Sequence, residues 1–242
     1  MIKARHAVAG LAVALSLAAC QKAEDAAFGN KVRAYLLEHP EVIREAVQKL
    51  NEKEQLAAAK VAGEMVEKHR AELERDPRDF VANPGGKVTV VEFYDYRCGY
   101  CKIAAPEVID LIRANPDVRF VFKELPIFGD VSDTAARIAL TGPAKAKGLE
   151  LYGRWMEEKS LDEASLDRHL REAGIDPAAA RKAAQSPEIS KHIADTQALA
   201  RSLKIEGTPA FVVGTTVIPG ADMNALRTAI TQAKAGDLKR PA

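Results

Sequence analysis

The stretch VTVVEFYDYRCGYC, residues 88–101, decides the fold of this chain. Its first half is apolar, β-branched and aromatic, which is typical of a short buried strand. A helical stretch then runs from the two cysteines to Asn115, and VRFVFK (118–123) predicts a second strand. The order strand, helix, strand predicts a βαβ unit with both thiols at the N-terminus of its helix.

The two cysteines of this unit carry the predicted chemistry. Unpaired backbone N–H groups and the helix dipole stabilise a thiolate at a helix N-terminus, which lowers its pKa from about 8.5. Cys98 stands at the very end of the helix, so we expect it to be the attacking nucleophile and Cys101 the resolving thiol. The dipeptide Gly99-Tyr100 between them suits a Cys98–Cys101 disulfide that opens and closes with little backbone movement.

Zinc binding and a purely structural disulfide are the competing uses of a CxxC motif. A closed zinc site needs four ligands, and Cys20 is the only other cysteine of the chain. The five histidines show no metal-ligand spacing near the motif, so we expect no resident metal and no cofactor. Transient copper(I) binding by Cys98 and Cys101 stays open, because two thiolates suit a soft metal.

Two of the charged residues near the motif have two interpretations each. Glu92 interrupts the apolar strand, and a buried carboxylate there would suit a proton acceptor for Cys101, while the alternative is an edge carboxylate that faces solvent. Asp95 and Arg97 flank Cys98 on the loop. Arg97 would either stabilise the thiolate or be an ordinary solvated arginine.

A second signal lies far downstream, in IEGTPAFVV (205–213). Thr208-Pro209 stands just before a short apolar strand, a turn at Gly214 leads to a hairpin partner at Val217-Ile218, and a helix follows from about Asp222 to Ala235. Between the two signals, the residue pattern predicts a run of helices. Its helices are expected at 134–140, 149–159, 164–173 and 186–203.

Upstream, residues 28–76 predict a helical arm. Between Glu41 and Asp76 there is no proline and one glycine, and strong helix formers dominate. A single helix over 41–76 would be roughly 54 Å long. Leu36, Ile43, Leu50 and Ala57 recur at heptad spacing, which favours self-association into a dimer or trimer, although the companion positions are too polar for a regular coiled coil. The alternatives are a helix packed on its own domain or a solvated spacer, and residues 77–87 are expected to be a linker.

The first 19 residues predict an export signal. Lys3 and Arg5 precede an uncharged run over 7–19, which is too short to span a membrane but suits a secretory signal. The end LAAC resembles a bacterial lipobox, so Cys20 is a candidate for lipidation, with residues 20–27 as a tether. A plain signal peptide cut nearby is the alternative. Both predict a periplasmic protein, with an outer-membrane anchor favoured, in a compartment that is oxidising.

The charge balance excludes one class of partner. The chain has 35 Lys and Arg against 34 Asp and Glu; loss of Lys3 and Arg5 with residues 1–19 leaves 33 against 34, a net charge of −1. No basic excess exists to neutralise phosphates, so we expect no nucleic-acid partner.

The motifs together resemble the DsbA-like branch of the thioredoxin superfamily, especially the ScsC group and related Com-type outer-membrane proteins. The resemblance is carried by EFYDYRCGYCK, FKELPIFGD, GTPAFVVG, Pro106 and YLLEHPEV in the arm. It implies an α/β thioredoxin fold over 88–240 that contains a helical insertion over about 130–203. It also implies that Glu92 matches the acidic residue before the catalytic motif, and that Thr208-Pro209 is the cis-proline loop that contacts substrate.

The expected activity is thiol–disulfide exchange on exported proteins that contain cysteines, with a membrane redox partner that resets the cysteine pair. The dipeptide Gly99-Tyr100 resembles that of periplasmic disulfide isomerases, and an oligomer brings several active sites to one substrate. An oligomeric isomerase or reductase is therefore the first hypothesis. A monomeric dithiol oxidase, a copper(I)-sequestering protein and a lipoprotein scaffold are the alternatives.

Overall fold

The computed structural model describes residues 27–236, and the chain divides into two compact units, residues 1–57 and 58–242. The predicted signal peptide and Cys20 lie outside the described residues. In the first unit, residues 27–38 are helical, and helix α2 (Glu41–Lys68) begins directly after Pro40. Proline suits a helix start because it has no N–H to leave unpaired.

The predicted single helix over 41–76 is wrong at its C-terminal end. Helix α2 ends at Lys68 and a short helix, α3 (Arg70–Glu74), follows after His69. Val66 and Leu73 are each 1% exposed and pack in a core with strand residues of the second unit. Residues 58–76 therefore belong to the second unit and not to a separate arm.

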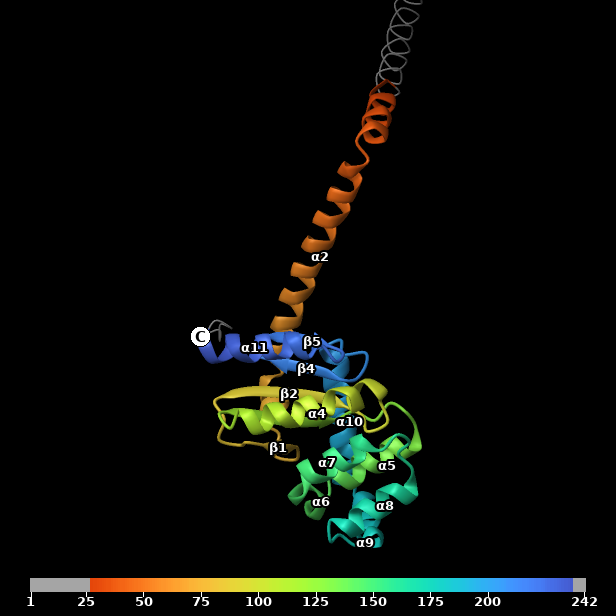
Figure 1. Ribbon diagram of the computed structural model, residues 1–242, viewed down its shortest axis with the longest axis vertical. Coiled ribbons are helices and arrows are strands. Elements are labelled where there is room, and N and C mark those ends of the chain that lie inside the picture. Colours follow the sequence, from red (N-terminus) through yellow and green to blue (C-terminus); the bar gives the residue numbers. More distant parts are fainter. Residues whose placement is uncertain (1–26, 237–242) are drawn as a thin grey trace, which may run out of the picture. The chain divides into compact units, whose positions relative to one another are not determined.

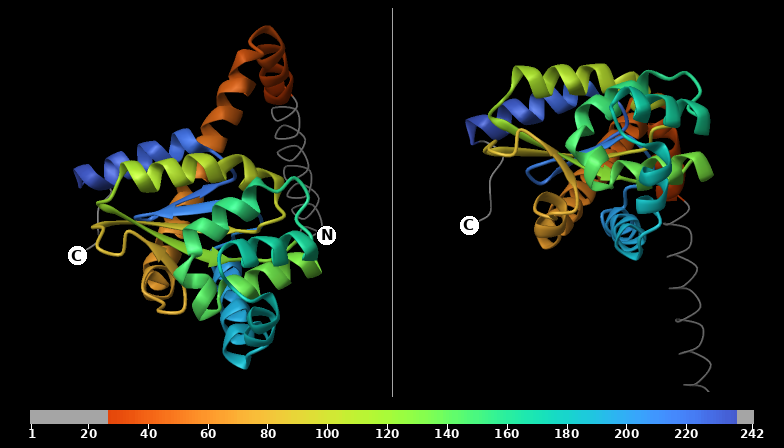
Figure 2. Two further views of the ribbon diagram at one scale, coloured as in Figure 1. Left: turned by 60° about the horizontal axis from the view of Figure 1, so that its bottom comes forward. Right: turned by 90° about the horizontal axis from the view of Figure 1, so that it is seen from below.

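The second unit is built on a five-stranded sheet of order β1-β3-β2-β4-β5 (Figures 1 and 2). Strands β2 and β3 are parallel, and every other neighbouring pair is antiparallel. The strands are β1 (Phe80–Ala82), β2 (Val88–Tyr94), β3 (Val118–Glu124), β4 (Ala210–Val213) and β5 (Thr216–Pro219). The predicted βαβ unit and the hairpin near Gly214 are thus confirmed.

Strand β1 corrects the predicted linker over 77–87. Its three residues pair with β3, Phe80 opposite Phe122, so this segment is the edge of the sheet. Gly86, further along, lies so close to the backbone of Val118 and Arg119 that a Cβ would collide with it. The segment is therefore a packed part of the domain.

Helices cover both faces of the sheet, so the central strand β2 is buried on both sides. Figure 2 shows α4 and α11 on one face and α10 on the other. Alternate residues of β2 divide between these layers: Val90 and Tyr94 face α4 and α11, whereas Val91 and Phe93 pack with α10. The helices are α4 (Gly99–Ala114), α5 (Asp130–Ala139), α6 (Gly142–Ala146), α7 (Gly148–Glu157), α8 (Glu163–Glu172), α9 (Pro177–Ala184), α10 (Pro187–Ser202) and α11 (Met223–Ala235).

Helices α5 to α10 lie between β3 and β4 in the chain, where the helical insertion was predicted. The expected start of α10 is confirmed, since the Ser186 side chain accepts a hydrogen bond from the N–H of Ile189 and Pro187 occupies the first turn. Helices α6 and α9 were not predicted. Both are short and rich in alanine, with little apolar periodicity to mark them.

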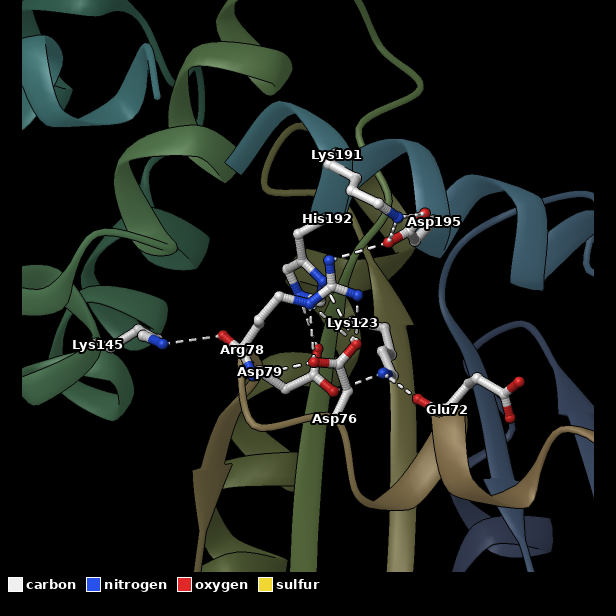
Figure 3. A network of polar contacts seen from close by, with 9 residues as sticks. All are labelled: Glu72, Asp76, Arg78, Asp79, Lys123, Lys145, Lys191, His192 and Asp195. Atoms are coloured by element: carbon white, nitrogen blue, oxygen red, sulfur yellow. Dashed lines mark hydrogen bonds and ion pairs between the residues drawn. The ribbon is translucent and has the colours of Figure 1, made fainter. Parts of the chain in front are cut away.

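A network of charged groups fastens residues 72–79 to the sheet and to α10 (Figure 3). The buried Lys123 on β3 donates to the carbonyl oxygen of Glu72 and to the carboxylate of Asp79. His192 of α10 lies 3.0 Å from the same carboxylate, Nε2 to Oδ1. Arg78 spans Asp76 and Asp195 in a similar way. The charges of Lys123 and Asp79 are deeply buried, and charges in such a position need partners.

Candidate functional site

The site begins where β2 ends. Cys98 is the residue that caps the N-terminus of α4, and its extended backbone, φ −69° and ψ 121°, turns the chain from loop to helix. Its N–H donates to the carbonyl oxygen of Asp95 at 3.1 Å, which closes the loop between strand and helix. Cys98 is 3% exposed and Cys101 is 0% exposed, and both are free thiols. Cys98 is therefore the more accessible of the two.

The loop before β4 meets the cysteines although it is distant in sequence. The Thr208–Pro209 peptide bond is cis, as predicted. The Cys98 sulfur lies 3.1 Å from the carbonyl oxygen of Thr208, across 110 positions of the chain, and donates a hydrogen bond to it when protonated. The structure thus brings together the two sequence signals that were predicted to form one site.

The surroundings of Cys98 favour its thiolate. Hydrogen bonds from the Cys101 thiol, from the Thr208 side chain and from the backbone N–H groups of Cys101 and Tyr100 lower the pKa of Cys98 to about 5, although burial acts in the opposite direction. Donors at a helix N-terminus supply this stabilisation wherever the first turn leaves its N–H groups unpaired. At neutral pH the Cys98 sulfur is therefore ionised.

Cys101 lies in the opposite environment. Burial, the hydrogen bond to Cys98 and the nearby Glu92 carboxylate all raise the pKa of Cys101 far above that of an ordinary thiol. A thiol with a strongly raised pKa keeps its proton until a base takes it. The pair is thus one thiolate and one protonated thiol that donates to it.

Glu92 is buried, at 1% exposed, so the interpretation as a solvent-facing edge carboxylate is wrong. It lies on the central strand β2, opposite Phe122 of β3 and Phe211 of β4. Burial raises its pKa to about 8, partly offset by the hydroxyl of Tyr152, which donates to Oε1 at 3.1 Å and Oε2 at 3.2 Å. A carboxyl group with a pKa near 8 exchanges its proton readily at physiological pH.

Sequence reasoning missed a buried polar cluster beside this carboxyl group. The hydroxyls of Tyr94 and Tyr96 both donate to Oε1 of Glu124, whose pKa is raised well above its usual range by burial. Tyr96 also packs edge-on against Trp155 with ring centroids 4.9 Å apart. Nothing in the sequence marks Tyr152 or Trp155 as part of the site, because they come from helix α7 of the insertion.

The loop arginine has a role that neither interpretation included. Arg97 does not pair with the thiolate; its Nη1 donates to the backbone carbonyl of Phe128 at 2.8 Å. Tyr100 of the dipeptide is 67% exposed in the first turn of α4, and Ile103, one turn on, is 69% exposed. The surface around Cys98 therefore contains large apolar groups that lie open to solvent.

Within residues 27–236, no group of three or more His, Cys, Asp or Glu side chains is arranged to hold a metal ion. Transient copper binding at Cys98 and Cys101 stays a prediction. In the same range, none of the helices combines the length and apolar character that a membrane span needs.

Comparison with known proteins agrees with this geometry. Residues 89–231 match the DSBA-like thioredoxin domain family, and residues 24–57 match the copper resistance protein ScsC N-terminal domain. BcfH of Salmonella enterica Typhimurium is 34% identical, with a TM-score of 0.70, over 85% of this chain and 94% of that one. ScsC of Proteus mirabilis, in a transitional conformation, is 30% identical, with a TM-score of 0.65, over 90% and 98%.

A thioredoxin-like oxidoreductase of Silicibacter pomeroyi is 40% identical, with a TM-score of 0.65, and the match covers 69% of this chain and 98% of that one. Among curated relatives, the Na(+)/H(+) antiporter NhaA 1 of Salinispora arenicola is 33% identical over 181 residues. That match covers 69% of this chain and only 26% of the antiporter, so the chain spans about a quarter of that relative's length. By its fold, its cysteine pair and these matches, the chain belongs to the DSBA-like thioredoxin domain family, with an N-terminal domain of the ScsC type.

Proposed function

We propose that this protein exchanges disulfides with exported polypeptides and works as an oligomeric isomerase or reductase. The observation that carries the proposal is the pairing of an ionised Cys98, with a pKa of about 5, and a protonated, fully buried Cys101. This arrangement gives the two sulfurs different roles. The Cys98 thiolate can attack a disulfide directly, whereas the Cys101 thiol must first lose its proton.

The first step is a substitution at sulfur. The Cys98 thiolate attacks one sulfur of a substrate disulfide, a mixed disulfide forms, and the other substrate sulfur leaves as a thiolate. The Thr208 side chain and the cis-Pro209 loop lie beside this sulfur. We assign this loop to substrate contact.

Two outcomes follow from the mixed disulfide. In isomerisation, the freed substrate thiolate or another substrate cysteine attacks the mixed disulfide, Cys98 leaves as a thiolate, and no net oxidation occurs. In reduction, the ionised form of Glu92 takes the proton of Cys101, and the Cys101 sulfur attacks Cys98, so the substrate leaves reduced and Cys98–Cys101 becomes the disulfide. A membrane partner of the thiol–disulfide class then returns two electrons to the pair.

Self-association is proposed through the first unit. Its apolar stripe, defined as Ile43, Val47 and Leu50, lies on one face of α2, and its members are 52%, 51% and 54% exposed. Apolar residues at this spacing need a covering surface. A dimer or trimer formed through this stripe would hold several Cys98 thiolates near one substrate, which raises their effective concentration.

We also propose a periplasmic location with lipid attachment at Cys20. The motif at residues 1–20 supports it. So does the similarity to a protein described as a periplasmic thioredoxin-like protein from Salmonella enterica serovar Typhimurium, 30% identical over 69% of this chain. An oxidising compartment is where substrates with disulfides occur.

The test is reactivation of scrambled ribonuclease by the reduced full chain, by C98S, and by the stripe variant I43S/V47S/L50S. The matched control, E45S/K49S/E52S, places three serines on the opposite face of α2. We expect C98S to be inactive, the stripe variant to sediment as a monomer with at least about tenfold less isomerisation, and the control to resemble the wild type. A monomeric stripe variant with full isomerase activity would contradict the oligomeric part of the proposal.

A dithiol oxidase is the second candidate, because the low pKa of Cys98 also favours it. A thiolate of low pKa is a good leaving group, which makes the Cys98–Cys101 disulfide oxidising. An oxidase would oxidise reduced ribonuclease rapidly whether or not the stripe is intact. An isomerase would lose most of its isomerisation activity in the stripe variant.

A further inference from the structure

The backbone of Asp95 makes contacts with both cysteines. Its carbonyl oxygen accepts a hydrogen bond from the N–H of Cys98 at 3.1 Å. Burial raises the pKa of Cys101, whereas a backbone hydrogen bond from Asp95 lowers it. Such a bond lowers a pKa because a donor N–H favours the charged form of the sulfur that it faces. The position of this one residue therefore matters for the charge that Cys101 carries when it reacts.

Two tyrosines flank Asp95 in the chain, and one carboxyl group binds both of them. Tyr94 ends strand β2 and lies opposite Glu124 of β3 in the parallel ladder. The hydroxyls of Tyr94 and Tyr96 both donate to Oε1 of Glu124, the second at 3.2 Å, and the two hydroxyl oxygens lie 3.0 Å apart. The segment that contains Asp95 is thus fastened on both sides to a single oxygen atom.

This tyrosine cluster, defined as Tyr94, Tyr96 and Glu124, is buried and uncharged. Its members are 2%, 3% and 4% exposed. Burial raises the pKa of Glu124 well above its usual range, although the two tyrosine hydroxyls act in the opposite direction. Oε2 of Glu124 has no hydrogen-bond partner within residues 27–236, so a charge on this group would be poorly compensated. Glu124 therefore acts as a neutral hydrogen-bond acceptor, and water does not compete with its bonds.

The rings of the cluster also border the group that takes the proton of Cys101. Tyr94 packs edge-on against Tyr152, with ring centroids 5.3 Å apart. The hydroxyl of Tyr152 donates to Glu92 at 3.1 Å. A shift of the tyrosine cluster would therefore disturb both the backbone donor and the base that serve the second cysteine.

We propose that Glu124 is a positioning residue for the step in which Cys101 resolves a mixed disulfide. By holding the two tyrosines, it keeps the backbone of Asp95 in place beside the Cys101 sulfur. The inference rests on the proposed function and deepens it, because it assigns a residue to one of its two chemical steps.

The resolving step moves charge onto the buried sulfur. The ionised form of Glu92 takes the proton of Cys101, and the Cys101 sulfur attacks Cys98. The Cys98–Cys101 bond forms, the bond between Cys98 and the substrate breaks, and the substrate sulfur leaves as a thiolate. A donor that is already in place when the charge develops accelerates such a step.

The first step does not depend on the tyrosine cluster in the same way. The Cys98 thiolate is stabilised by the Cys101 thiol, by Thr208 and by the N–H groups of the first helical turn. Asp95 contacts the N–H of Cys98 and not its sulfur. Loss of the cluster should therefore slow the resolving step and leave the first attack unchanged.

The experiment follows both steps with oxidised glutathione as the probe. Reduced full-length wild type, E124L and Y96F are mixed with it, quenched in acid at intervals and alkylated. Peptide mass spectrometry then gives the fractions of Cys98 that are free, bound to glutathione or bound to Cys101. E124L removes the acceptor at similar volume. Y96F removes one hydrogen bond and leaves Glu124 bound to Tyr94, so it decides the matter if E124L does not fold.

We expect the first step to stay within about twofold of wild type in both variants. The resolving step should fall at least about tenfold in E124L, because a small misplacement of reacting groups is enough for such a loss. It should fall about threefold in Y96F, which loses one neutral hydrogen bond. The glutathione adduct at Cys98 then accumulates. E124Q is the matched control: its amide oxygen accepts the same two hydroxyls, so both steps should stay within about twofold of wild type.

Different results would overturn the inference and the proposed function. A wild type that forms neither the glutathione adduct at Cys98 nor the Cys98–Cys101 disulfide would refute the proposed function itself. With an active wild type, unchanged resolution in the folded variants would refute the role of Glu124. Equal slowing of both steps would also refute it, since the cluster would then support only the fold. Resolution as slow in E124Q as in E124L would show that the acceptor role assigned to Glu124 is wrong.

Discussion

The Cys98 sulfur lies among hydrogen-bond donors, and one of them is the thiol of Cys101, its resolving partner. The Cys101 thiol is the largest of the influences that lower the pKa of Cys98 to about 5. We therefore expect C101A to raise that pKa by about one unit or more, because a hydrogen bond to a charged group is lost. C101S keeps a hydroxyl donor at the same place and is the matched control.

The ultraviolet absorbance of the thiolate, followed through a pH titration, measures this midpoint. Equal midpoints in C101A, C101S and wild type would mean that the helix N-terminus alone stabilises the sulfur.

Because of Glu92, we expect the free energy of unfolding to fall as the pH rises. Its pKa is about 8 in the folded protein against an ordinary value near 4.5, so the folded state holds the proton more tightly. The stabilising contribution is complete below about pH 4.5 and is lost as the pH rises through 8. E92Q has no such group, so its free energy of unfolding should depend less on pH across that window and exceed that of wild type above pH 8.

The comparison is made on oxidised protein, because Cys98 does not titrate when it is in a disulfide. Chemical denaturation at a series of pH values gives the two curves, and E206Q, a change at an exposed carboxylate, is the control. Parallel curves for wild type and E92Q would show that Glu92 titrates normally and that its burial has no energetic consequence.

At the scale of single elements, strand β3 contains a buried lysine, Lys123. Lys123 and Asp79 have side chains that are 1% and 0% exposed, and K123M removes one partner of this buried pair. An uncompensated buried charge costs about 3–5 kcal/mol, so we expect a loss of that size in the free energy of unfolding. The double variant K123M/D79N should lose less than K123M alone, because no charge is left unpaired between the two positions.

K191M is the matched control, since Lys191 belongs to the same network but is 71% exposed in its pair with Asp195. We expect it to change the free energy of unfolding by less than about 1 kcal/mol in a urea titration. An equally small effect of K123M would mean that the buried network does not fasten residues 72–79 to the sheet.

The sequence predicted those elements whose signal is local. Strand β2 and the start of α10 depend on β-branched runs, a Ser cap and a Pro in the first turn, and they form as expected. Strand β1 has only three residues and exists because β3 offers it an edge, so no local pattern could predict it. The same holds at the site: Cys98, Cys101 and Glu92 stand in recognisable positions, whereas Tyr152 acquires its role only through a contact across the fold.

For the whole molecule, the ionised Cys98 links redox state to stability. The pKa of about 5 lies below that of an unfolded thiol, about 8.5, so the reduced folded state gains stability as the pH rises between these values. The contribution is complete above about pH 8.5 and is lost as the pH falls through 5. The oxidised form has no such group.

We therefore expect the difference in unfolding free energy, reduced minus oxidised, to grow with pH from 5 to about 8.5. Denaturant titrations of both redox forms, with C98S as the control that lacks the thiolate, measure it. A difference that stays constant with pH would show that the thiolate is no better stabilised in the fold than in the unfolded chain.

The two outer strands of the sheet have a consequence for the whole molecule. Strand β1 is three residues long, and β5 is four residues long and ends in Pro219, which has no N–H to offer. Unfolded polypeptides readily extend a free sheet edge by adding a strand, which is a route to aggregation. Edge strands this short offer an unfolded polypeptide few backbone N–H and C=O groups to pair with. Under the proposed function, a misfolded chain bound through Cys98 therefore meets no long free edge that could template a fibre, and it can be released.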